Sequence, residues 1–364
     1  MKSYNHLMEK TISDENIMLA IRNSTRGKRK RPRIKELFEN AINHIRDFKD
    51  MANFKNDHHR PKEIYDGISR KRRTIIVPST REQVVHHMIV NVIKPIFTRG
   101  MYEHAYGSLP HKGAHKAKKV MAKWLRDNKN NKYVMKLDIR KYFESIPHDI
   151  LKAKLSKLIS DKAFLKLIFE VIDVTDKGLP LGFYTSQWFS MWYLKDFDHY
   201  VKETLGAKYY MRYMDDMVIL GSNKRELSNM LAKIKVKLAE LGLELNNKSQ
   251  IFRFDYYNRQ KDRRCGRDID YMGFRFYRDK TILRKSILYK MTRKARKIHD
   301  KPKATVHDLR QMLSYVGWIK HCQIYNVWVR MVKPYFSVRN AKKRISNYDR
   351  RENRCLLELK TATA

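Results

Sequence analysis

Residues 212–220 read RYMDDMVIL and place two adjacent aspartates, Asp215 and Asp216, between apolar segments on both sides. The flanking residues are typical of β-strands, and aspartate tolerates turn geometry, so the pair is expected in a tight turn between two short strands. Two like charges in apolar surroundings are costly unless a cation lies against them. The sequence therefore predicts a metal site at this turn.

A third aspartate is expected close to that turn. Residues 132–151 read KYVMKLDIRKYFESIPHDIL, which predicts a buried strand that ends at Asp138. Repulsion among Asp138, Asp215 and Asp216 would raise their pKa values, whereas two divalent ions turn the repulsion into ligation. Magnesium suits carboxylate oxygens and takes further contacts from a substrate triphosphate. One of two Mg²⁺ ions would activate a primer 3′-hydroxyl, and the other would stabilise the departing pyrophosphate. A solvated turn is the plainer alternative, but the apolar strands disfavour it.

The composition points to a polyanionic partner. The 364 residues include 79 Lys and Arg against 38 Asp and Glu, a formal net charge of +41. Nucleic acid is the expected partner of such a chain. An anionic membrane is disfavoured, because we find no long apolar run, no apolar signal segment and no lipidation motif. The three cysteines have neither zinc nor disulfide spacing, which fits a reducing cytoplasm.

Hydrophobic patterning predicts an α+β fold around a small antiparallel sheet. A β-branched strand at 74–77 is followed by a helix that begins near Ser79 or Thr80, and a second amphipathic helix covers 224–241. Strands alternate with helices, and no glycine-rich phosphate loop is present. A basic run near the amino terminus is either a solvated loop or a contact to nucleic-acid backbone, and we favour the contact. Its four central residues are Lys28, Arg29, Lys30 and Arg31.

Five segments together resemble the reverse transcriptases. YMDD at 213–216 and KLDIRKYF at 136–143 are similar to the two aspartate motifs of that family. GLPLGFYTSQ at 178–187 resembles the nucleotide-binding motif, while LGLELNNKSQ at 241–250 and YMGFRF at 271–276 resemble the last palm motif and the primer grip. The segments follow the family's order, and the resemblance covers residues from about 60 to 330.

The resemblance implies a right-hand polymerase. Its expected parts are a basic helical extension at 1–60, fingers at 61–130, a palm at 131–283 that contains a fingers segment at about 150–177, a helical thumb at 284–335, and a basic tail at 336–364 that frays. We expect no nuclease module after the thumb, because too few residues follow it. The enzyme would therefore depend on partner molecules.

The resemblance also implies roles for single residues. Asp138 and Asp215 would be the principal metal ligands, and Asp216 would assist them near the primer terminus. Phe143 matches the aromatic gate that excludes a ribose 2′-hydroxyl, with a plain core phenylalanine as the alternative. The remaining implied contacts are Lys71 or Arg73 with the triphosphate, Leu181, Gly182 and Gln187 with the nucleotide, Lys248 with the pyrophosphate unless it is a surface lysine, and Tyr271, Met272 and Gly273 with the primer.

One departure from the common family pattern points to a subgroup of the reverse transcriptases. Most reverse transcriptases have glutamine before the glycine of the nucleotide motif and proline after its serine, where this chain has Leu181 and Gln187. That variation resembles the enzymes of diversity-generating retroelements, in which it is associated with errors opposite template adenines. This resemblance implies a bacterial or phage-encoded enzyme, a structured RNA that serves as template and primer, dNTP substrates, a cDNA product, and a small basic accessory protein in an oligomeric assembly.

Two alternatives stay open. A bacterial reverse transcriptase of anti-phage defence, acting with a noncoding RNA, would use the same chemistry. A catalytically silent RNA-binding protein would keep the fold without the reaction. The three aspartates argue against the silent protein, because loss of activity would relax such costly charges.

Overall fold

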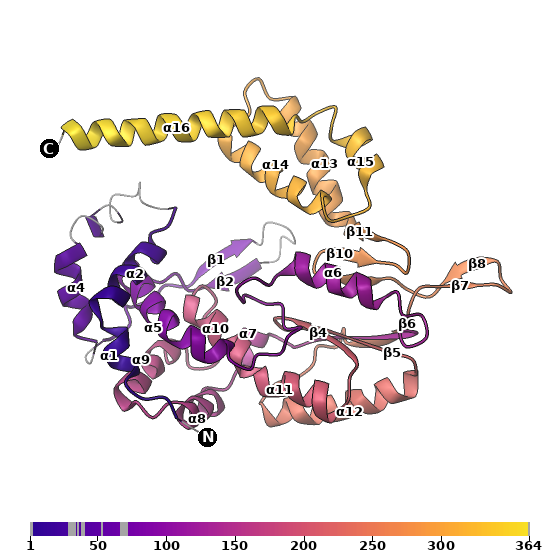
Figure 1. Ribbon diagram of the computed structural model, residues 1–364, viewed down its shortest axis with the longest axis horizontal. Coiled ribbons are helices and arrows are strands. Elements are labelled where there is room, and N and C mark those ends of the chain that lie inside the picture. Colours follow the sequence, from indigo (N-terminus) through magenta and orange to yellow (C-terminus); the bar gives the residue numbers. More distant parts are fainter. Residues whose placement is uncertain are drawn as a thin grey trace. The chain divides into compact units, whose positions relative to one another are not determined.

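The computed structural model describes residues 3–27, 34, 36–37, 41–51, 54–65 and 72–362. The chain divides into two compact units. Unit 1 contains Met1–Ala117 and Asn128–Arg253, and unit 2 contains Lys118–Asp127 and Phe254–Ala364. Each unit has a hydrophobic core of its own, and Figure 1 shows the elements of both, with labels where there is room.

Unit 1 is built on a four-stranded antiparallel sheet. Its strands are β3 (Tyr133–Asp138), β4 (Tyr209–Tyr213), β5 (Asp216–Gly221) and β6 (Gln250–Arg253), in the order β4-β5-β3-β6. The two central strands, β3 and β5, are apolar over most of their length because both faces are covered. Helices α11 (Lys195–His199) and α12 (Lys224–Glu240) lie along one side of this sheet (Figure 1).

The helices of unit 1 gather around α5 (Thr80–Thr98), which begins with a capping box between Ser79 and Glu82. Helices α1 (Leu7–Thr11), α2 (Asp14–Ser24) and α10 (Tyr184–Tyr193) pack against it. The other elements of this unit are α4 (Ala41–Lys49), β1 (Lys62–Tyr65), β2 (Arg72–Ile75), α7 (Tyr142–Ser145), α8 (His148–Leu158), α9 (Lys162–Ile172) and the π-helix η1 (Tyr200–Thr204).

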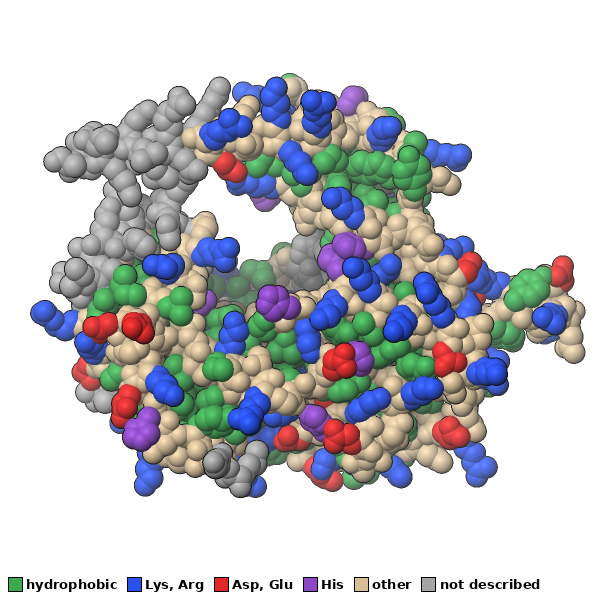
Figure 2. Space-filling model, in the orientation of Figure 1, with side chains coloured by type: hydrophobic (Ala, Val, Ile, Leu, Met, Phe, Trp, Pro, Cys, Tyr) green, Lys and Arg blue, Asp and Glu red, His purple; other side chains and the backbone are tan. Residues whose placement is uncertain are grey.

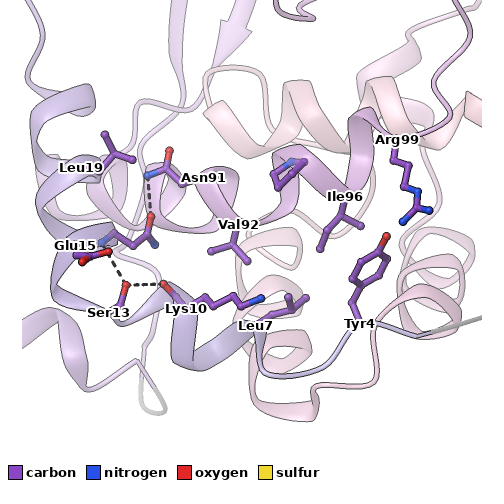
Figure 3. A pocket seen from close by; sticks show the side chains of 12 residues that line it. Tyr4, Leu7, Lys10, Ser13, Glu15, Leu19, Asn91, Val92, Ile96 and Arg99 are labelled. Carbon is purple, nitrogen blue, oxygen red and sulfur yellow. Dashed lines mark hydrogen bonds between the residues drawn. The ribbon is translucent and has the colours of Figure 1, made fainter.

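Paired asparagines tie the amino-terminal helices to α5. Asn91 Nδ2 donates to Asn16 Oδ1 at 2.9 Å, and Asn16 Nδ2 donates to the carbonyls of Thr11 and Met88. Both asparagines line a groove of about 600 Å³ between α1, α2 and α5, and Figure 3 shows Asn91 among the residues that line it. The Asn16 amide can make all of these hydrogen bonds only when α2 and α5 lie in one relative placement. The pair therefore fixes how the amino-terminal segment lies on α5.

Unit 2 combines small sheets with helices. Strands β9 (Ile269–Tyr271), β10 (Phe274–Phe276) and β11 (Thr281–Leu283) form one antiparallel sheet, and β7 (Tyr256–Asn258) pairs with β8 (Arg263–Cys265) in another. The helices are α13 (Lys285–His299), α14 (Val306–Ile319), α15 (Tyr325–Met331) and α16 (Val338–Ala362). Helix α6 (Ala114–Trp124) crosses the division between the units.

The predicted α+β class with small antiparallel sheets is confirmed. One local prediction was wrong, because the strand placed at 74–77 lies at Arg72–Ile75, where it pairs with β1. The tail contains helix α16 as far as Ala362, and its fraying stays a prediction. Within the residues that the structure describes, no helix combines the length and the apolar character needed to cross a bilayer.

A buried histidine gives the core of unit 1 a pH dependence. His86 on α5 lies against the Phe183 ring, with Nδ1 3.1 Å from Thr185 Oγ1. Burial lowers the pKa of His86 to about 3. The unfolded chain therefore takes up this proton near pH 6.5, well before the folded chain does, and stability is lost as the pH falls below 6.5.

We expect His86→Gln to remove this loss. Relative to the wild type, its free energy of unfolding should improve by about 1.5 kcal/mol between pH 6.5 and pH 5. Denaturant titrations over that pH range measure the difference. His58→Gln, at an exposed histidine, is the control and should run parallel to the wild type. Parallel curves for His86→Gln as well would show that His86 is not a neutral core residue.

Candidate active site

The turn between β4 and β5 contains Asp215, one of the three aspartates that the sequence predicts at the site. Tyr213 pairs with Asp216 in the β4–β5 register, so Met214 and Asp215 form the turn and Asp216 is the first residue of β5. The sequence prediction had put both aspartates in the turn. Met214 has a φ of 57°, a left-handed conformation that costs a residue with a side chain about 1–2 kcal/mol. Other contacts must therefore hold this turn.

The three predicted aspartates come together at the end of the sheet. Asp138 ends β3 directly opposite Asp216, so the two side chains share one face. The Ile139 amide donates to the Asp215 carbonyl at 3.4 Å. The pKa of Asp216 is raised to about 7, mainly by burial and in addition by the charges of Asp138 and Asp215, while Lys136 opposes the rise.

Two groups beside these aspartates were missed in the sequence. Lys136 Nζ lies 3.5 Å from Asp216 Oδ2. Asn246 Nδ2 donates to Asp138 Oδ2 at 3.0 Å, and the Asn246 amide donates to the Asp138 carbonyl at 2.7 Å. The signal for Lys136 was present, because residues two apart on a strand share a face. Asn246 could not be paired with Asp138 from its position in the sequence.

The donor chemistry of the aspartates suits magnesium. All the donors are carboxylate oxygens, and burial with mutual repulsion leaves Asp216 in need of a nearby cation. In this structure the Lys136 ammonium lies there. Among the described residues, no group of three or more His, Cys, Asp or Glu side chains is placed to hold a metal ion. The aspartates thus fit magnesium in charge and donor type, whereas a ligand geometry is not formed.

A buried ion pair supports the turn between β4 and β5. Arg212 and Asp198 are both 0% exposed, with Nε 2.7 Å from Oδ1 and Nη2 2.5 Å from Oδ2. The Tyr210 hydroxyl donates to the same carboxylate at 2.6 Å. Burial by itself would lower the pKa of Arg212, but Asp198 raises it above its ordinary value. The remaining Arg212 nitrogen, Nη1, donates to the Met214 carbonyl at 3.0 Å and so holds the strained residue of the turn.

A backbone segment packs against the same turn. The Tyr106 amide donates to the Arg212 carbonyl at 2.7 Å, and the Arg212 amide donates to the His104 carbonyl at 3.1 Å. A Cβ on Gly107 would lie 2.2 Å from Met191 Sδ and 2.6 Å from Met214 Sδ. A side chain at that position would displace the two methionine side chains, because their sulfur atoms fill the space that it would need.

The predicted nucleotide motif is fixed to the segment that follows β2. The Leu181 carbonyl accepts from the Ile76 amide at 2.8 Å. Gly182 has a φ of 117°, and a Cβ there would lie 2.1 Å from the Ile76 carbonyl oxygen. Gly182 and Gln187 both line a cavity of about 340 Å³ next to this contact. The structure thus brings these two predicted residues together.

Two further predicted residues are Phe143 and Lys248, which lie close to the predicted motifs in the sequence. Phe143 is half-buried against the core of unit 1, and its carbonyl accepts from the Leu179 amide at 2.6 Å, which joins it to the nucleotide motif. Lys248 is exposed, and its amide donates at 3.2 Å to Asn246, the residue that contacts Asp138.

The remaining predicted residues lie elsewhere. Arg73 is exposed on β2. Tyr271, Met272 and Gly273 belong to unit 2, where Met272 (φ 52°) and Gly273 (φ 83°) form the two-residue connection of the β9–β10 hairpin. Five predicted contact residues fall outside the residues that the structure describes, namely Lys28, Arg29, Lys30, Arg31 and Lys71.

Comparison with known proteins gives one family and several relatives. A family model described as reverse transcriptase (RNA-dependent DNA polymerase) matches residues 55–276. Protein YkfC of Escherichia coli (strain K12) is 26% identical over 145 residues, which cover 36% of this chain and 38% of YkfC. The retron Ec73 reverse transcriptase of Escherichia coli is 25% identical over 199 residues, which cover 50% of this chain and 60% of that enzyme. The chain thus spans less than two thirds of either relative.

A search of solved structures adds weaker likenesses. Telomerase from Candida albicans, in complex with a TWJ fragment of telomeric RNA, matches with a TM-score of 0.46 and 13% identity. The match covers 82% of this chain and 59% of the telomerase chain.

The buried ion pair makes a testable contribution to the turn. Arg212→Met leaves the Asp198 carboxylate buried without its cation, so we expect the free energy of unfolding to fall by about 3–5 kcal/mol. Combining it with Asp198→Leu should restore most of that loss, since the unpaired charge is gone. Amide hydrogen exchange at 213–216 should still be faster in the stable double variant, because the Met214 carbonyl has lost its donor. Unchanged exchange there would mean that Arg212 does not hold the turn.

Proposed function

The chain belongs to the reverse transcriptase (RNA-dependent DNA polymerase) family, because the family model matches more than half of it, and on that premise we propose that it copies an RNA template into cDNA from dNTPs. One observation carries the proposal. Asp138 and Asp216 stand opposite each other at the end of a buried sheet, with Asp215 in the adjoining turn. In this proposal the three carboxylates would supply oxygen ligands to the cations of nucleotidyl transfer.

The aspartates would hold two magnesium ions. When bound, the ions would supply activation of the primer 3′-hydroxyl and charge stabilisation of the leaving pyrophosphate. The chain itself performs the positioning. Arg212 fixes the turn through the Met214 carbonyl, Asn246 orients the Asp138 carboxylate, and Lys136 balances the charge of Asp216. Each group acts before substrate arrives, so little reorganisation is needed during the reaction.

The nucleotide would bind against the motif at 178–187. The approach of Gly182 to Ile76 supports this, since a close backbone contact leaves the loop rigid. In this proposal Phe143 excludes the ribose 2′-hydroxyl, and Lys71 or Arg73 holds the triphosphate by charge-assisted hydrogen bonds. Lys248 contacts the pyrophosphate, and Tyr271, Met272 and Gly273 contact the primer. The proposed parts of the enzyme are fingers at 61–130, a palm at 131–283 and a thumb at 284–335.

We further propose that the enzyme belongs to the diversity-generating type and copies with errors opposite template adenines. Leu181 and Gln187 support this assignment, because an apolar residue at 181 removes an amide that could bond the incoming nucleotide. A structured RNA, a small basic accessory protein in an oligomeric assembly, and a bacterial cytoplasm complete the proposal, and the basic segment 28–31 would contact RNA backbone.

A second candidate is a retron-like enzyme of phage defence that acts with a noncoding RNA. The likeness to the retron Ec73 reverse transcriptase favours it. Sequencing of the DNA made with the flanking noncoding RNA distinguishes the two candidates. Errors concentrated at template adenines fit the diversity-generating type, while accurate or repetitive DNA fits the retron-like type.

Asp215→Asn tests the proposed reaction directly. We expect primer extension on an RNA template to fall by at least a factor of about 1,000, because a charged ligand is lost while the side-chain shape is kept. EDTA should abolish extension by the wild type, and added magnesium should restore it. Asp176→Asn, at an exposed aspartate, is the matched control and should retain full activity.

Extension that persists in Asp215→Asn would overturn the assignment of the site. A wild-type protein that binds RNA but extends no primer in magnesium would instead support the catalytically silent alternative.

Leu181→Gln tests the basis of the expected errors. Restoring an amide that can bond the incoming nucleotide should lower misincorporation opposite adenine by about tenfold, which corresponds to about 1.4 kcal/mol, and should leave extension nearly unchanged. Leu181→Met keeps an apolar side chain of similar volume and is the control. The measurement is sequencing of cDNA made by the three proteins from one RNA template. Equal error rates in all three would rule out a role for residue 181 in fidelity.

A further inference from the structure

The β7–β8 hairpin of unit 2 is separate from the other sheet of that unit. Residues 256–265, here termed the basic hairpin, form a two-stranded sheet of their own, with Tyr256 paired with Cys265 and Asn258 with Arg263. Within unit 2 the hairpin stands away from the β9–β11 sheet (Figure 1). Its residues are exposed or half-buried. An isolated two-stranded hairpin is only marginally stable, so something outside the strands must hold it.

Ion pairs at its base hold the hairpin in place. The buried Asp255 carboxylate accepts from Arg264 Nε at 2.6 Å and from the Arg278 amide at 2.8 Å. Arg264 also reaches Asp279 through Nη2 at 2.6 Å. Arg278 Nη1 in turn donates to the Leu125 carbonyl at 3.2 Å. The base of the hairpin is therefore fixed to the body of unit 2, while its tip lacks a hydrophobic core.

The tip carries more positive than negative charge. Arg259, Lys261 and Arg263 are exposed, and no ion pair to a carboxylate of the described residues is formed by these three side chains. Asp262, the one acidic residue between 256 and 267, accepts a hydrogen bond from the Tyr257 hydroxyl. Figure 2 shows Lys and Arg side chains over the visible face of the protein, and at this tip three of them lie within five residues.

Tyr257 adds an aromatic surface to the same tip. It is 60% exposed, and the hydrogen bond from its hydroxyl to Asp262 restricts the orientation of the ring. A restricted ring loses little conformational entropy when a flat partner stacks on it. Exposed aromatic rings beside cations are the combination that binds unpaired nucleic acid, since bases stack while phosphates meet the cations.

We propose that the basic hairpin binds an unpaired stretch of RNA, with a base stacked on Tyr257 and phosphates on Arg259, Lys261 and Arg263. The choice of RNA as the ligand rests on the proposed function, whereas the binding surface itself does not depend on catalysis. A duplex would use the cations but has no free base for the ring. The hairpin thereby gives the enzyme a contact to template or guide RNA that does not involve the aspartates.

Binding measurements on the full chain test the proposal. The probes are a fluorescent single-stranded oligouridylate and a blunt RNA duplex of the same length, titrated by anisotropy over a series of salt concentrations. The variants are Arg259→Ala/Lys261→Ala/Arg263→Ala, Tyr257→Ala and Tyr257→Phe. The matched control is Lys224→Ala/Lys233→Ala/Lys235→Ala, which removes the same charge from exposed positions of α12. Thermal unfolding confirms that each variant is folded.

The hairpin triple variant should lose about 2 from the slope of log affinity against log salt for the single strand, as expected for three phosphate contacts. The control triple variant should keep the wild-type slope. Tyr257→Ala should weaken single-strand binding by about tenfold and leave duplex binding unchanged, while Tyr257→Phe keeps the stacking ring and most of the affinity.

Other outcomes overturn the proposal. Equal losses in the hairpin and control triple variants would mean that the hairpin contributes only general charge. A loss for Tyr257→Ala that is the same on duplex and single strand would exclude stacking of an unpaired base. Unchanged single-strand binding by the hairpin triple variant would exclude RNA as the ligand of the tip. Primer extension by the hairpin variants on a short primed template is expected to persist, so a failed binding test and a failed catalytic assignment are distinguishable.

Discussion

The buried pair of Arg212 and Asp198 is the interaction on which the site depends. Two fully buried charges are tolerated only when their hydrogen bonds are complete, and here a bidentate pair is joined by the Tyr210 hydroxyl. The guanidinium has one nitrogen left, and this nitrogen holds the Met214 carbonyl. The strained turn that presents Asp215 is therefore anchored to helix α11. Burial of the Arg212 charge is unfavourable by itself, but it places the guanidinium where it holds the turn and so the position of the Asp215 carboxylate.

Close backbone approaches make the rest of the site rigid. Gly107 leaves room for the sulfur atoms of Met191 and Met214, and Gly182 allows the nucleotide motif to touch the Ile76 carbonyl. A methyl group at Gly182 would force the Ile76 backbone away, whereas one at Gly107 would displace the two methionine side chains. The carboxylates are then held at a place where burial and repulsion raise the pKa of Asp216, so the protein carries a local excess of negative charge that a cation relieves.

Much of this arrangement could be read from local patterns. The strand that ends at Asp138, the turn at Asp215, the helix from Lys224 and the β9–β10 hairpin all follow from hydrophobic periodicity and turn chemistry. Lys136 could have been added from strand alternation. Arg212 stands beside the motif in the sequence, yet nothing local indicates that its partner is an aspartate on a helix 14 residues earlier. In the sequence, the basic hairpin is likewise recognisable only as a stretch rich in tyrosine and arginine, and not as a separate sheet.

The sequence by itself determined the fold class, the three acidic residues, the family resemblance and the large positive charge, because each of these depends on residue type and short-range spacing. The tertiary structure alone decided which groups meet: Asp138 with Asp216 in register, Asn246 with Asp138, Arg212 with Asp198 and Gly182 with Ile76. Propensity and turn chemistry act over a few residues, whereas these contacts join segments that only strand register and helix packing bring together.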